Sequence, residues 1–455
     1  MNLPAAAARL ATGADLPALV APPPGPLSLA WLQRFARVAA PMGPRAAWAG
    51  LAEDAAEPSA PGTIVYEAGF GSNLLDVDGN RYVDLAAGFG SLLLGHNASR
   101  VVEAVAQQAR HLSQALGDLH PSVPKIRLLE RLSERFGQRQ AILGQSGADA
   151  LSAALKTAVL ATGRPRVIAF AGAYHGLSYG PLALCGLRES YRAPFAAQLN
   201  PEVAYVEYPS DGPQLIRALA AVRSELERGD VGAVVFEPIL GRGGCVVPPP
   251  EFAARLAELC RQEGSLLVAD EIWTGLGRAG RWLYSAAGGV EADLVCLGKG
   301  LGGGLPISAC LGRRELCSAW SRAEEVVHTS TFAGAPLACA SALATLEALD
   351  SDGLVARSER MGGEFRTALR AAVQSSGTEL VEEVRGAGLM IGIELRPVNA
   401  VAIRLCRELL GSGYVVSLGG GLRDTLVLTP ALDISERLLE SFVRAFADAL
   451  GRVAA

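Results

Sequence analysis

The sequence predicts an α/β protein with a large, doubly wound, mainly parallel sheet domain and a smaller α+β domain. Between about residues 100 and 345, helical periodicity alternates with short, nearly all-apolar segments that end in polar or glycine residues. Continuous apolar runs of this length are typical of strands in a parallel sheet covered on both faces. The chain has 455 residues, more than one hydrophobic core usually supports, so a second domain is expected.

Composition and charge favour small-molecule chemistry. The net charge is -5 and there is no basic run, which excludes the electrostatic signature of a nucleic-acid-binding or membrane-surface protein. The eight cysteines form no Cys-x-x-Cys pair and have no accompanying histidine cluster, so we expect reduced core cysteines and no metal site. With no targeting pattern in the first thirty residues, the sequence predicts a cytoplasmic protein.

Changes in composition and in hydrophobic pattern divide the chain into four segments. Residues 1–62 form an N-terminal arm, a mobile tail or a strap over a partner subunit, with a possible helix over 28–39. The next segment contains a hairpin turn at Asp78-Gly79-Asn80. The predicted boundaries are 1–62 for the arm, 63–99 for an N-terminal segment of the small domain, 100–345 for the large domain and 346–455 for the C-terminal small domain.

The expected strands place four chemically interesting residues at one edge. The strand candidates of the large domain are RVIAF, GAVVFEP, SLLVADE, ADLVCLG and ISACLG, and those of the small domain are GLMIGIEL, YVVSL and TLVLTPAL, before a closing helix from about residue 435. Ligands bind outside the carboxyl ends of the strands in such sheets. Tyr174, Glu237, Asp270 and Lys299 fall at those ends.

Lys299 is the first candidate catalytic residue. It lies in GKGLGGG, between an apolar strand and a glycine run that allows close backbone approach to a bulky group. A buried lysine can act as a neutral nucleophile; a solvated loop lysine is the alternative. The Gly-x-Gly-x-x-Gly pattern here also suggests a nicotinamide-binding turn, but Pro306 and a further strand follow where that motif needs a helix.

Asp270 and Tyr174 are candidate ligand contacts. Asp270 ends the strand SLLVAD, where a carboxylate could pair with a protonated pyridine nitrogen; capping the next turn is the alternative. Tyr174 follows RVIAF, and its ring could stack on a flat aromatic ligand or pack in the core.

A helix start supplies a candidate anion site. Ser146 and Asp149 are spaced as a capping box at the beginning of a predicted helix. The first-turn amides of Gly147 and Ala148 would face a phosphate, although most capping boxes bind nothing.

Six motifs in order resemble the signature series of class III aminotransferases, which are fold-type I enzymes dependent on pyridoxal 5′-phosphate (PLP). The motifs are SGADA, AYHG, EPILGRGG, ADEIWTGLGRAG, GKGLGGGLP and TSTFAG, within a match over roughly 63–435. The interval of 29 residues from Asp270 to Lys299 is also similar to that of the family, which includes ornithine, acetylornithine and 4-aminobutyrate aminotransferases.

The resemblance implies roles for individual residues. Lys299 is similar to the lysine that forms a Schiff base with PLP, and Asp270 to the partner of the pyridinium nitrogen. The other cofactor-binding residues that it implies are Ser146, Gly147, Ala148, Tyr174, His175, Glu237 and Ile272. Thr331 is similar to a threonine that reaches the phosphate in the neighbouring subunit, so a homodimer with shared active sites is implied.

The chain departs from the family at the substrate side. Trp273 stands where many members have a glutamine directed at the cofactor. Arg242 replaces a glutamate, Val427 its arginine partner, and Leu177 the arginine that often follows YHG. We therefore expect Arg242 to bind a substrate carboxylate in a pocket made more apolar by Leu177, Val427, Phe89 and Trp273. The alternative is an Arg242 that points to solvent or pairs with an acid.

The expected function is transfer of an amino group, omega-amino groups included, from an amine or amino acid to a 2-oxo acid by a ping-pong mechanism. An aminomutase or racemase on the same fold is one alternative, which net amino transfer to a second molecule would exclude. A non-catalytic PLP-fold binding protein is a more remote one, which a cofactor absorption band would exclude.

Overall fold

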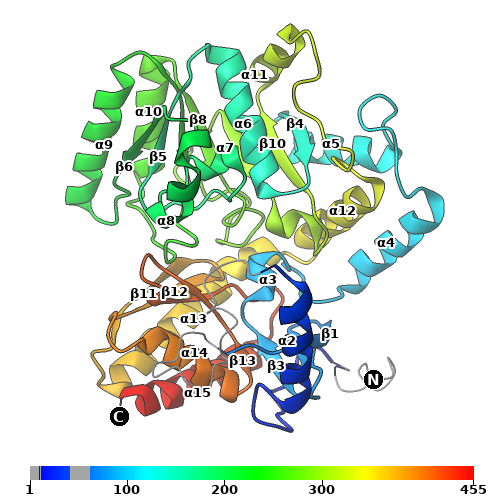
Figure 1. Cartoon of the computed structure of the whole chain (residues 1–455), viewed down its shortest axis with the longest axis vertical. Helices are drawn as coiled ribbons and strands as arrows, with labels where there is room; N and C mark the ends of the chain where they lie inside the picture. The colour runs from blue at the N-terminus through cyan, green and yellow to red at the C-terminus, as the bar shows by residue number, and fades with distance from the viewer. Residues whose placement is uncertain (1–9, 11, 41–61, 455) are drawn as a thin grey trace.

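The computed structural model describes residues 10, 12–40 and 62–454, and these form two halves, one above the other in Figure 1. The upper half contains a seven-stranded sheet in the order β4-β10-β9-β8-β7-β5-β6. Its strands are β4 (Gln140–Gly144), β5 (Arg166–Phe170), β6 (Val203–Val206), β7 (Val231–Phe236), β8 (Leu266–Asp270), β9 (Leu294–Leu297) and β10 (Ser308–Gly312). The predicted doubly wound, mainly parallel domain is confirmed.

One strand differs from the prediction. The segment ISACLG forms β10, which is antiparallel to both β4 and β9, with Cys310 opposite Ile142 and Cys296. Too few residues separate β9 from β10 for a parallel crossover, which needs a dozen or more. The edge strands β4 and β6 were absent from the prediction. Both are short and partly exposed, unlike the fully buried central strands β7 and β8.

Helices cover both faces of this sheet. Val167 and Ala169 of β5 belong to the same apolar cluster as α6 (Gly147–Thr162). The alternate residues Ile168 and Phe170 belong to the cluster of α9 (Gly212–Leu226), α10 (Phe252–Glu263) and α12 (Pro336–Ser351). Because successive side chains of a strand point to opposite faces, both faces of β5 are buried, as its unbroken apolar sequence predicts.

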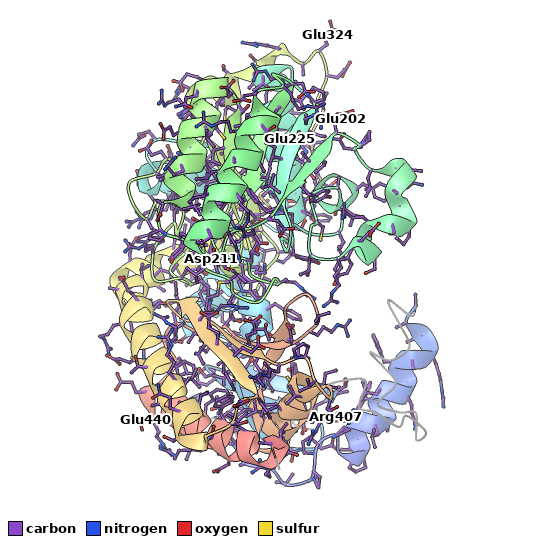
Figure 2. The ribbon with its side chains drawn as sticks, turned by 90° about the vertical axis from the view of Figure 1, so that its left-hand side faces the viewer. Glu202, Asp211, Glu225, Glu324, Arg407 and Glu440 are labelled. Atoms are coloured by element: carbon purple, nitrogen blue, oxygen red, sulfur yellow. The ribbon has the colours of Figure 1, made fainter. Side chains whose placement is uncertain are left out.

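The lower half contains two four-stranded sheets and the long helices of the C-terminal part of the chain (Figure 1). The sheets are β1 (Tyr66–Phe70), β2 (Asn73–Asp76), β3 (Arg81–Asp84) and β13 (Tyr414–Val415), and β11 (Val381–Ala387), β12 (Met390–Leu395), β15 (Thr425–Leu428) and β14 (Ser417–Gly419). The helices are α13 (Leu354–Ser376), α14 (Val401–Gly411) and α15 (Glu436–Ala454). In Figure 2, Arg407 of α14 and Glu440 of α15 lie in this half, and Glu225 of α9 in the upper one.

The predicted single strand YVVSL is wrong, because it is divided between the two sheets. Tyr414 and Val415 pair with β3 in parallel, and Ser417–Gly419 pair with β15. The chain therefore changes sheets at residue 416. The pairing of β3 with β13 joins the 63–99 segment to the C-terminal part of the chain.

The predicted hairpin is confirmed, and its turn holds part of the arm. β2 and β3 pair antiparallel around the turn. The carboxylate of Asp78 accepts the N–H groups of Leu27 and Ser28 at 2.7 and 2.9 Å, so it caps the start of α2 (Pro26–Val38). Figure 2 shows α2 at the edge of the molecule. Residues 41–61 of the predicted arm lie outside the described residues.

The remaining helices connect the halves or lie at the ends of strands. They are α3 (Ala87–Gly90), α4 (Ser99–His111), α5 (Val123–Arg135), α7 (Tyr179–Leu182), α8 (Glu189–Arg192), η3 (Ala193–Gln198), η4 (Lys299–Gly302), α11 (Arg314–Cys317) and η5 (Ser318–Arg322). In Figure 1, α3 lies where the two halves meet. Of the helices described here, none is long and apolar enough to cross a membrane.

Candidate active site at the carboxyl edge of the large sheet

Four parallel strands bring the predicted residues to one edge. Strands β5, β7, β8 and β9 run in the same direction. Glu237 directly follows β7, Asp270 ends β8, and Tyr174 and Lys299 lie shortly after β5 and β9. Lys299 begins the short helix η4, and β10 follows, so the turn lacks the helix that a nicotinamide-binding motif requires.

Asp270 is paired with His175. Its Oδ2 lies 2.7 Å from His175 Nδ1, and its Oδ1 accepts the N–H of Ile272 at 3.1 Å. Burial lowers the pKa of His175, but the hydrogen bond and negative charge of Asp270 outweigh it and leave this pKa raised. The pair fixes the orientation of the carboxylate. The buried Nε2 of His175 has no partner among the described residues.

Glu237 links two loops of the site. Its carboxylate accepts the N–H of Tyr174 at 2.7 Å and the N–H of Gly241 at 3.0 Å. Burial raises the pKa of Glu237 to about 7, against the opposing positive charge of His175. The loop that contains Tyr174 and the loop that contains Arg242 are therefore held by one buried side chain.

Lys299 has an uncommon backbone conformation and a buried amine. Its φ is 38°, a left-handed value that costs free energy for a residue with a Cβ and is often found at functional sites. Burial lowers the pKa of Lys299, and the negative charges of Asp270 and Glu237 act in the opposite direction. Its Nζ lies over the ring of Trp273, 4.5 Å from the centroid.

The start of α6 provides free N–H groups beside these strands. The capping box is present: Ser146 Oγ accepts the N–H of Asp149, and the Asp149 carboxylate accepts that of Ser146. Within the described chain, no partner accepts the N–H groups of Gly147 and Ala148. A Cβ on Gly147 would lie 2.7 Å from Cδ1 of Ile272, so a glycine is needed for this close packing.

Arg242 lies inside the site. Its guanidinium carbon is 5.0 Å from the centroid of the Tyr174 ring. Burial raises the pKa of Tyr174, and the positive charge of Arg242 only partly opposes that rise. Its Nε is buried without a hydrogen-bond partner in the described structure. The Arg242 carbonyl accepts the N–H of Gly420 at 2.9 Å. The backbone is therefore fixed while the charged end lacks an acidic partner among the described residues.

The other predicted residues differ in exposure. Trp273 is buried, with 7% of its surface exposed, whereas Phe89 is 56% and Leu177 49% exposed. Val427 is 1% exposed and belongs to the same apolar cluster as Trp273. The expectation that Val427 lines the pocket is therefore wrong. Val427 packs in the apolar cluster that contains Trp273. Thr331 is exposed, and its carbonyl accepts Gln114 Nε2 at 3.0 Å.

Two glycines at the site were missed. A Cβ on Gly90 would lie 2.4 Å from Nε1 of Trp273, and one on Gly241 2.4 Å from Cε3 of the same ring. Glycine content alone could not reveal them, because many glycines of the chain serve turns. The feature of the sequence that could have indicated them is Trp273, in the motif ADEIWTGLGRAG. Such a bulky side chain needs small neighbours if it is to be closely packed.

These groups fit a phosphorylated pyridine aldehyde. The free N–H groups at the start of α6 match a phosphate, and the Asp270 carboxylate matches a protonated ring nitrogen. The Lys299 amine can react with an aldehyde. The orphaned Nε2 of His175 leaves one further polar contact available beside Asp270.

Comparison with known proteins gives the same class of enzyme as the six sequence motifs. Residues 55–450 match the family model described as aminotransferase class-III. The chain is 38% identical over 393 residues to the acetylornithine aminotransferase of Mycobacterium tuberculosis, covering 86% of this chain and 92% of that protein. It is 36% identical over 380 residues to the acetylornithine aminotransferase of Archaeoglobus fulgidus, covering 84% and 94%.

Solved structures agree. The ornithine aminotransferase of Toxoplasma gondii ME49 superposes with a TM-score of 0.82 at 28% identity, covering 94% of this chain and 95% of that one. An amine transaminase from an uncultivated Pseudomonas species, in a PLP-bound form, superposes with a TM-score of 0.80 at 27% identity, covering 91% and 98%. The chain belongs to the class III aminotransferase family. It is a PLP-dependent transaminase of fold type I.

Proposed function

We propose that transamination takes place at the carboxyl edge of the large sheet, with Lys299 as the residue that bonds the cofactor and moves protons. The supporting observation is that Lys299, Asp270 and the free N–H groups of α6 meet at this edge. Ser146, Gly147 and Ala148 would hold the phosphate, and Tyr174 and Ile272 would lie against the ring. His175 and Glu237 would fix Asp270 and the Tyr174 loop through the hydrogen bonds described above.

PLP supplies an aldehyde that binds amines and a ring that delocalises negative charge from the adjacent carbon. Asp270 would hold the ring nitrogen and keep it protonated, because a nearby carboxylate favours the charged form. Once free of the cofactor, the Nζ of Lys299 would serve as the general base and then the general acid that moves the substrate proton. The two half-reactions give ping-pong kinetics.

Lys299→Ala is expected to abolish transamination and the absorption band of the lysine-bound cofactor, while circular dichroism shows an intact fold. Lys156→Ala is the matched control, because Lys156 is exposed on α6 and bonds only the Val327 carbonyl among its described neighbours. Near-normal turnover by Lys299→Ala would contradict the assignment. Conversion of the cofactor to its amine form by the donor alone, followed by reversal with an oxo acid, would separate transamination from isomerisation.

For the substrate, we propose an amino donor or oxo acid whose carboxylate is bound by Arg242. A guanidinium without an acidic partner in the described structure, half-buried beside Tyr174, is suited to bidentate binding of a carboxylate. Phe89 and Trp273 would contact the rest of the substrate. The relatives are named for acetylornithine and ornithine. In this chain the exposed Leu177 and the buried Val427, at positions that resemble arginine positions of many family members, carry no charge.

We also propose a homodimer with shared active sites. Exposed large apolar residues gather on two segments: Leu112, Leu116, Leu119, Val123 and Ile126 on the first, and Val326, Val327 and Phe332 on the second. The segments are joined by the bond between Gln114 and Thr331. Exposed patches of this kind are typical of protein interfaces. The exposed Thr331 would then face a phosphate in the partner subunit.

A reducing, cytoplasmic environment is consistent with the cysteines. All eight are free, and all but Cys317 are buried. We propose this location on their chemistry alone.

A further inference from the structure

We infer that Trp273 is a positioning residue for Lys299: the face of its indole holds the free amine in place and stabilises its ammonium form. This inference rests on the proposed role of Lys299. It concerns the half-reaction in which the lysine is not bonded to the cofactor and must hold, and then return, a proton.

The contact has the geometry of a cation–π interaction. Lys299 Nζ lies over the indole, 4.5 Å from its centroid, within the roughly 6 Å over which a tryptophan face attracts an ammonium group. Trp273 is 7% exposed, so little water screens the attraction. In such a setting the electrostatic attraction to the ring is stronger than at a surface.

Close packing by neighbouring residues holds the indole ring in this position. Gly90 lies against the Nε1 side of the indole and Gly241 against its six-membered ring, each so close that a Cβ would come within 2.4 Å. Met390 and Val427 pack in the same apolar cluster. Trp273 thus contacts segments from both halves of the molecule, and its ring has little freedom to turn away from Lys299.

The indole N–H makes no hydrogen bond to the described residues that would hold the ring in this position. Nε1 is buried and has no hydrogen-bond partner among the described residues. A buried donor left unpaired is costly, and an aliphatic side chain would fill the space without that cost. The part of Trp273 that contacts Lys299 is the face of the ring.

The surroundings of Lys299 lower its pKa, with burial as the largest cause, so its ammonium form gains from a further stabilising contact. Asp270 and Glu237 favour the ammonium form, whereas Arg242 and burial oppose it. Asp270 is already paired with His175, and Glu237 accepts two backbone N–H groups. The Trp273 face is a further stabilising contact, and unlike the two carboxylates it makes no other polar bond in the described structure.

The test measures the pKa of Lys299 directly. The chain has three lysines, Lys125, Lys156 and Lys299, so full-length enzyme containing ¹³Cε-lysine gives one signal for each. The enzyme is loaded with pyridoxamine phosphate, in which form Lys299 is free. Preparations are made with tryptophan and with analogues containing increasing numbers of fluorine atoms, which keep the shape of the ring and weaken its negative face. Each preparation is titrated by NMR.

We expect the Lys299 pKa to fall stepwise with fluorination, by about 0.4 to 1.5 pKa units in total, which is the range of a cation–π contact. Lys125 and Lys156 should not shift. Trp273→Phe enzyme made with the same analogues should lose the trend, which assigns it to this ring among the five tryptophans. A Lys299 pKa that is unchanged across the series, or a trend that survives in Trp273→Phe, would overturn the inference.

A backbone variant gives an independent measurement. Gly241→Ala should displace the indole and lower the Lys299 pKa, whereas Gly212→Ala, where a Cβ meets open space, should not. An equal pKa in the two variants would contradict the role of the glycines in holding the ring. Because the titration does not depend on turnover, its failure is distinguishable from failure of the proposed transamination, which Lys299→Ala tests.

Discussion

At the scale of single residues, the site consists of charged groups that are strongly restrained by their neighbours. Asp270 is fixed by His175 and by the N–H of Ile272, and Glu237 by two loop N–H groups. Arg242 is the exception, because its backbone is fixed and its charged end is not paired within the described structure. An unpaired cation in a site that binds amino and oxo acids has a carboxylate as its natural partner.

Arg242→Ala is therefore expected to raise the Michaelis constant for a carboxylate-bearing substrate by at least about tenfold, with little effect on a neutral amine. The reason is that only the first substrate loses a bidentate pair. Steady-state kinetics with a matched pair of donors, with and without the carboxylate, measures the difference. Arg242→Lys keeps the charge but not the paired donors of the guanidinium. Its Michaelis constant for the carboxylate-bearing substrate should lie between those of the unaltered enzyme and Arg242→Ala. Equal losses for both donors would show that Arg242 does not bind the carboxylate.

The sequence predicted the residues that follow strands better than the contacts between them. Lys299 and Asp270 could be placed because an apolar strand precedes each, and the Ser146 capping box because its spacing is local. The contact of Trp273 with Lys299 could not be predicted, because it depends on how two strand ends and two distant glycines meet. The burial of Val427 was missed for the same reason.

At the scale of elements, local patterns predicted the central strands and long helices, and tertiary pairing decided the rest. Nothing in the apolar run of β10 distinguishes a parallel from an antiparallel strand; the short connection from β9 does. The division of YVVSL between two sheets likewise follows from its partners. Close packing between elements, which is also invisible in the sequence, is clearest where α13 meets the turn between β11 and β12.

Gly362→Ala is expected to destabilise the protein by about 1 to 3 kcal/mol. A Cβ at Gly362 would lie 1.7 Å from the carbonyl oxygen of Gly388, so α13 would have to move off the turn. The neighbouring Gly363 is the matched control, because nothing lies within 4 Å of its Cβ position. Gly363→Ala should stabilise the helix by about 0.5 to 1 kcal/mol. Urea denaturation of both variants checks the prediction, and similar midpoints would contradict it.

At the scale of the whole molecule, the proposed dimer follows from where apolar surface is left uncovered. The segments around Leu119 and Val326 are exposed although α5 and α12, to which they connect, are packed against each other. Thr331 lies within the second segment, and the neighbouring Ser330 bonds Gln145, just before the α6 N-terminus. An interface here would place the proposed phosphate site beside the partner subunit, so dimerisation and cofactor retention should be coupled.

Leu119→Lys is expected to weaken the dimer and, with it, cofactor binding. Leu119 is 73% exposed in the described chain; covering it in an interface contributes roughly 1.5 to 3 kcal/mol, so its loss should raise the dimer dissociation constant at least about tenfold. Sedimentation velocity over a concentration series measures this, and release of PLP on dilution should follow it. Ile216→Lys is the matched control, because Ile216 is 72% exposed but lies on α9, outside the two apolar segments. If both variants dissociate alike, or if Leu119→Lys dissociates but keeps its cofactor, the active sites are not shared across this surface.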